Sequence, residues 1–68
     1  MKIEFIKDES TKTVKVKVNG ENYGELIFDV DQNAWVLWPE KIDDGVTYYD
    51  DLQETMDQIE FELEHADD

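Results

Sequence analysis

Strict alternation of apolar and charged residues over residues 13–18, "TVKVKV", constrains the fold of this chain more than any other feature. Successive side chains of a strand point to opposite faces, so the three valines share one face and the two lysines share the other. Asn19 and Gly20 follow directly, and both tolerate the positive φ that a tight hairpin turn needs. The alternation therefore predicts a half-buried strand that leads into a hairpin.

The hairpin has two alternative registers. A two-residue loop places Val16 opposite Tyr23 and leaves the apolar residues of the next strand on the lysine face. A three-residue loop over residues 19–21 places Val14 opposite Leu26 and joins the two apolar sets. Because a one-residue slip moves every side chain to the other face, the larger apolar set should decide. We expect the longer loop.

The rest of the chain completes an α+β pattern. Residues 2–7, 23–30 and 35–38 have strand composition. A helical stripe with spacings of 4, 3 and 4 follows, formed by Leu52, Met56, Ile59 and Leu63. Thr47 followed by Asp50 fits an N-cap and its N3 acid. We predict a single α+β domain over residues 1–68, a four-stranded antiparallel β-meander with one C-terminal helix packed on one face.

The net charge of −13 is concentrated at one end of the chain. Residues 1–41 hold eight acidic residues and all six lysines, whereas residues 42–68 hold eleven acidic residues and no base. Like charges at helical spacing repel each other and destabilise a helix. We therefore interpret the acidic end as a surface for a basic partner.

Phe61 lies nine residues from Leu52, which is about half a turn around the helix axis. The ring should therefore point away from the core and lie among carboxylates; the alternative is that the helix end bends and buries it. The expected partner-binding residues are Asp43, Asp44, Asp50, Asp51, Glu54, Asp57, Phe61, Glu64 and Asp68.

Catalysis and cofactor binding are not expected. The only histidine is His65, close to the C-terminus, the only serine is Ser10 in the first predicted turn, and cysteine is absent. These residues cannot supply a nucleophilic triad. Residues 29–40 match the acidic spacing of an EF-hand, but Ala34 stands where the loop needs glycine and strands flank it. We expect a β-turn there, with no metal site and no cofactor.

Nucleic acids and membranes are not expected partners either. Phosphate contacts need Lys and Arg, and this chain has no Arg and a large negative charge. Anionic membrane surfaces attract basic segments for the same reason. Charged residues interrupt the first ten positions, which excludes a signal-peptide apolar core, so we expect a cytoplasmic protein.

The acidic end has the charge spacing of a DNA strand. If residues 50–68 were helical throughout, they would span about 28 Å, with one of nine carboxylates every roughly 3 Å. B-DNA has one phosphate per about 3.4 Å on each strand. In its small size, lack of cysteine, few basic residues and acidic helix on a small sheet, the chain resembles the bacteriophage-encoded DNA-mimic proteins of host takeover, which share no single fold. These block restriction enzymes, uracil-DNA glycosylase, nucleoid proteins such as the histone-like HU, or CRISPR effectors.

The resemblance implies an inhibitor that occupies the DNA-binding surface of a basic nucleic-acid-binding protein in a bacterial host. It carries over no site residues, because such mimics share no motif. The alternative is a generic acidic interaction module, or an antitoxin-like regulatory subunit, without DNA mimicry.

Apolar residues on the second sheet face predict self-association. A single helix covers one face, and Tyr23, Ile27 and Trp35, with Trp38 as the alternative tryptophan, would remain on the other. Exposed apolar surface of this kind marks interfaces, and two-fold dimers are their commonest form. We expect a homodimer.

Overall fold

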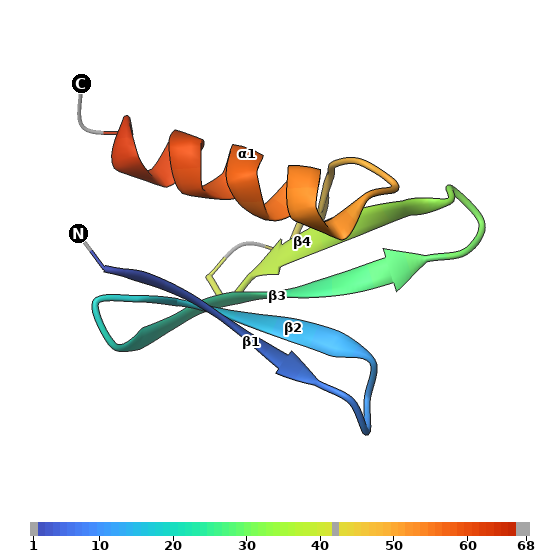
Figure 1. The fold of residues 1–68 in the computed structure, drawn as a ribbon, viewed down its shortest axis with the longest axis horizontal. Helices are drawn as coiled ribbons and strands as arrows, with labels where there is room; N and C mark the ends of the chain where they lie inside the picture. The colour runs from blue at the N-terminus through green and yellow to red at the C-terminus, as the bar shows by residue number, and fades with distance from the viewer. Residues whose placement is uncertain (1, 42, 67–68) are drawn as a thin grey trace.

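The computed structural model describes residues 2–41 and 43–66, and these form an α+β fold with five antiparallel strands and one helix. The elements are β1 (Ile3–Asp8), β2 (Thr13–Val18), β3 (Glu21–Asp29), β4 (Ala34–Pro39), β5 (Val46–Thr47) and α1 (Leu52–Glu64). The strands are neighbours in chain order, and α1 lies across one face of the sheet (Figure 1). The predicted meander with a C-terminal helix is confirmed, and the short β5 is an addition that pairs with β4.

The β2–β3 hairpin combines the two registers that the sequence left as alternatives. Its loop has two residues, Asn19 and Gly20, with φ of 55° and 83°. Val14 nevertheless lies opposite Leu26, because a β-bulge at Tyr23 inserts one extra residue into β3. The predicted pairing is therefore confirmed, whereas the predicted three-residue loop is wrong.

The other two hairpins share one loop design. Residues 9–12 and 30–33 form four-residue loops after Asp8 and Asp29, and each aspartate accepts the N–H two residues further on at 3.0 Å. The last residue of each loop has a positive φ, 57° in the first loop and 56° in the second. Residues 29–40 are thus the β3–β4 hairpin, as predicted, and not an EF-hand loop between two helices.

The core lies between the sheet and α1. Its buried centre consists of Val14, Val16, Leu26 and Leu37 from the strands and Ile59 from the helix. Leu52, Met56 and Leu63 pack around Ile59, so the predicted helical stripe is confirmed.

The start of α1 differs from the predicted one. Asp51 is the N-cap residue, and its side chain makes no capping hydrogen bond. Thr47 belongs to β5 and pairs with β4, so the predicted cap of Thr47 with Asp50 is wrong. Thr55 in the first helical turn is fully buried, and its Oγ1 lies 2.9 Å from the carbonyl oxygen of Asp51. This hydroxyl bond holds the first turn in place.

The uncovered face of the sheet has a different composition from the predicted one. Tyr23 and Trp35 pack against the core cluster on the side of α1, so their assignment to the uncovered face is wrong. Tyr23 faces α1 because of the β-bulge at this residue, which reverses the alternation of side chains along β3. Ile27 and Trp38 lie on the uncovered face, as cross-strand partners of Val36 and Glu25 respectively.

Candidate partner-binding surface

The outer face of α1 consists of carboxylates around one aromatic ring. Glu54, Asp57, Phe61 and Glu64 follow each other at steps of three or four residues, and all four are exposed. The opposite side of the helix holds Ile59 in the core. Phe61 is 57% exposed, which confirms the predicted outward orientation of its ring. The alternative, a bent helix end that buries the ring, is wrong.

A second exposed aromatic residue, Tyr49, lies beside this face. It is 43% exposed and lines a shallow surface hollow together with Glu54, Asp57, Gln58 and Phe61. Tyr49 is not among the partner-binding residues predicted from the sequence. The adjacent pair of tyrosines after β5 could have indicated an exposed ring here. In an extended segment, one of two neighbouring side chains points inward and the other outward. Tyr48 is the inward one and packs against the core.

The Phe61 ring is held by the last turn of the helix. It stacks on the His65 imidazole, with ring centroids 4.2 Å apart and planes 25° apart. His65 Nδ1 lies 2.8 Å from the Phe61 carbonyl oxygen, and the His65 backbone N–H donates to the same oxygen. A ring that is already ordered loses less conformational entropy when a partner covers it.

Two of the helix carboxylates have hydrogen-bond partners within the chain. Tyr48 Oη donates to Glu62 at 2.6 Å and joins the helix to the segment after β5. Burial of the ring, followed by this bond to Glu62, raises the pKa of Tyr48 well above its usual value. Gln53 donates to Asp57 Oδ1 at 3.0 Å and orients that carboxylate on the outer face.

The helix that carries the carboxylates is shorter than the helix over residues 50–68 that the sequence analysis considered. Helix α1 contains five carboxylates over 13 residues and no base in its last turn. At about 1.5 Å per residue it spans about 20 Å, or one carboxylate per about 4 Å. Averaged over all sides of the helix, this spacing is close to that of the phosphates on one DNA strand, whereas the outer face alone has one carboxylate per about 6 Å.

The remaining predicted residues lie outside the helix. Asp50 and Asp51 are exposed in the connection that precedes α1. Asp43 and Asp44 are exposed in the β4–β5 loop and do not line the hollow beside Phe61. Asp68 lies outside the described residues. The structure therefore brings together Glu54, Asp57 and Phe61, with Tyr49 added.

Comparison with known proteins gave no match: no protein-family model, no curated protein and no solved structure is significantly similar to this chain. Among residues 2–41 and 43–66, no group of three or more metal-ligating side chains could hold an ion. Within the same residues, no helix is both long enough and apolar enough to cross a membrane.

Proposed function

We propose that this chain binds the DNA-binding surface of a basic nucleic-acid-binding protein, such as a histone-like nucleoid protein, and blocks its access to DNA. The observation that carries the proposal is the outer face of α1, where exposed carboxylates surround an exposed aromatic ring. Such an inhibitor would act in the cytoplasm of a bacterial host, as the phage-encoded DNA mimics do.

The carboxylates supply long-range attraction. A protein groove that binds DNA presents Lys and Arg at the spacing of phosphates, and the helix offers negative charge at a similar spacing on a rigid support. Charge complementarity of this kind raises the association rate and fixes the orientation of the complex. It is weakened by salt, because exposed charges are screened over about 10 Å at 0.1 M ionic strength.

The aromatic rings supply short-range binding energy. Binding energy in protein interfaces concentrates in a few aromatic or Arg residues at the centre of the contact. Phe61 and Tyr49 lie together beside Glu54 and Asp57, so an Arg or Lys side chain of the partner would meet both aromatic and carboxylate groups there. We assign Phe61 as the anchor of the interface.

The test uses a purified histone-like nucleoid protein as the binding probe. The triple variant Glu54→Gln, Asp57→Asn, Glu64→Gln should bind with lower affinity and a flatter salt dependence than the wild type. Its matched control is Glu9→Gln, Glu21→Gln, Glu40→Gln, which removes the same charge from exposed residues outside the helix. The control should retain most of the affinity.

Equal losses in the two triple variants would show that only net charge matters, and the proposed surface would be wrong. A lysate experiment extends the test to other targets. The immobilised chain should retain DNA-binding proteins that a DNA duplex elutes, and retained proteins that DNA does not elute would favour an acidic module without mimicry.

A further inference from the structure

The uncovered face of the sheet carries exposed apolar side chains. Ile6, Ile27 and Trp38 are each between 39% and 44% exposed. They come from β1, β3 and β4, so the apolar surface extends across the sheet. Exposed apolar side chains on a sheet face that no other element covers are typical of interfaces.

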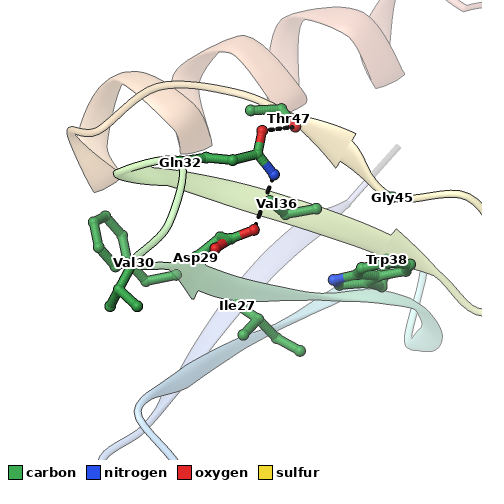
Figure 2. A pocket seen from close by; sticks show the side chains of 9 residues that line it. Ile27, Asp29, Val30, Gln32, Val36, Trp38, Gly45 and Thr47 are labelled. Carbon is green, nitrogen blue, oxygen red and sulfur yellow. Dashed lines mark hydrogen bonds between the residues drawn. The ribbon is translucent and has the colours of Figure 1, made fainter.

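Trp38 borders a hollow at the β5 side of this face. Figure 2 shows the lining side chains, among them Ile27, Val36 and Trp38, with Gln32 bridging Asp29 and Thr47 through hydrogen bonds. A Cβ at Gly45 would lie 2.7 Å from Val36 Cγ1 and 3.0 Å from the Trp38 ring, so the chain approaches this face closely there.

The centre of this face carries charges of both signs, whereas α1 carries only negative ones. One row across the sheet consists of Ile6, Lys15, Glu25 and Trp38, in which each residue is the cross-strand partner of the next. In the neighbouring row, Glu4 is opposite Lys17. By strand alternation, Asp8 and Asp29 also lie on this face, at the ends of β1 and β3, so the face as a whole is acidic and only its two central rows pair opposite charges. A second copy can therefore place opposite charges against these central rows, which it cannot do at α1.

We propose that the uncovered face binds a second copy of this chain in a two-fold, face-to-face dimer. In a two-fold interface, residue i of one copy contacts residue j of the other and the reverse contact also forms. A row with Lys15 beside Glu25 and an apolar residue at each end is self-complementary in this sense. Lys15 of one copy pairs with Glu25 of the other, and Ile6 with Trp38.

The size of the face limits the area that the dimer can bury. The molecule measures 33 by 24 by 24 Å, so its larger face has a projected area of about 800 Å². A standard protein interface buries about 800 Å² on each partner. The face cannot exceed that area, so we expect a weak dimer whose population depends on concentration.

This arrangement places α1 on the outside of both copies. Figure 1 shows the helix on one side of the sheet only, so sheets that meet through their uncovered faces leave both helices accessible. The dimer does not depend on the proposed function, because it uses the opposite face of the sheet.

The first experiment is sedimentation equilibrium from 5 μM to 1 mM. The wild type should shift from about 8 kDa to twice that mass across this range. Ile27→Lys should remain a monomer throughout. Phe61→Lys is the matched control, since it makes the same chemical change at an exposed apolar residue of the helix, and it should dimerise like the wild type.

The second experiment reverses charges. Lys15→Glu alone places like charges opposite each other and should weaken the dimer at least tenfold, whereas Lys15→Glu with Glu25→Lys should restore it. Thermal unfolding shows that each variant is folded. A wild type that remains at 8 kDa up to 1 mM overturns the proposal. Failure of the double reversal to restore the dimer excludes the proposed two-fold contact between Lys15 and Glu25.

Discussion

Replacement of Phe61 best separates the contribution of the aromatic ring to binding from the contribution of the carboxylates. The ring is exposed and contacts His65, so Phe61→Ala should change the free energy of unfolding by no more than about 0.5 kcal/mol. For an anchor residue that contributes about 2 kcal/mol, the dissociation rate from the nucleoid protein should rise about 30-fold. The salt dependence of binding should stay the same. Surface plasmon resonance measures both quantities, with Val30→Ala as an exposed apolar control outside the helix. An unchanged dissociation rate would remove Phe61 from the interface.

Asp8 and Asp29 give the fold a defined acid sensitivity. Hydrogen bonds from the Ser10 side chain and N–H lower the pKa of Asp8, and those from the Gln32 side chain and the Asp31 N–H lower the pKa of Asp29, both from an ordinary value of 3.8. A carboxylate with a lowered pKa stabilises the fold above its unfolded pKa, and this contribution is lost as the pH falls through the folded value.

Asp8→Asn with Asp29→Asn removes this titration. The difference in unfolding free energy between wild type and variant should therefore be constant above about pH 5 and shrink below about pH 4. Urea unfolding at several pH values measures it. A difference that stays the same down to about pH 3 would show that the two loop carboxylates contribute nothing pH-dependent.

At the scale of the elements, Thr55 joins α1 to the segment that precedes it. Its buried Oγ1 is within hydrogen-bond distance of the carbonyl oxygens of Asp51 and Tyr49, and it accepts the Tyr49 N–H. Thr55→Val keeps the shape but leaves these groups without the hydroxyl, which should cost about 1–3 kcal/mol in urea unfolding. Thr55→Ser keeps the bonds and loses one methyl group. Hydrogen exchange of the Tyr49 amide should accelerate in the Val variant only; equal exchange in both variants would contradict this role.

The elements that could be predicted from the sequence are those in which apolar residues recur at a constant spacing, two residues in a strand or three to four in a helix. The β2 valines and the α1 stripe specify their core faces directly, and the structure confirms both. The bulge at Tyr23 could not be predicted, because the choice between a longer loop and a tight turn with a bulge depends on the whole sheet. Because of the bulge, Tyr23 packs on the side of α1 and not on the uncovered face that the sequence predicted.

The residues of the candidate surface were likewise predictable only where they lie in an element of regular period. Phe61 was found because a helix has a fixed angle per residue, so its distance from Leu52 determined its direction. Tyr49 was missed because it lies in an irregular connection. Thr47 was misassigned because two residues of β5 are too few to show a strand period, and only the pairing with β4 reveals them.

At the scale of the whole molecule, the distribution of charge is more informative than its amount. Dispersed acidic residues would keep a small domain soluble at little cost. Here eleven of the 19 acidic residues lie in residues 42–68, without a base, and five of them are on one helix where they repel each other. A partner that supplies basic side chains would reduce that repulsion when it binds, which is the physical reason for proposing α1 as the binding surface.

The central claim is that the partner cannot bind DNA and this chain together. A fluorescence anisotropy titration tests it most directly: the chain is added to a histone-like nucleoid protein already bound to a labelled DNA duplex. We predict complete release of the DNA, with a midpoint that rises in proportion to the DNA concentration, and a midpoint at clearly higher concentration for the Glu54→Gln, Asp57→Asn, Glu64→Gln variant. A stable ternary complex, with DNA still bound while the chain binds with undiminished affinity, would contradict the account.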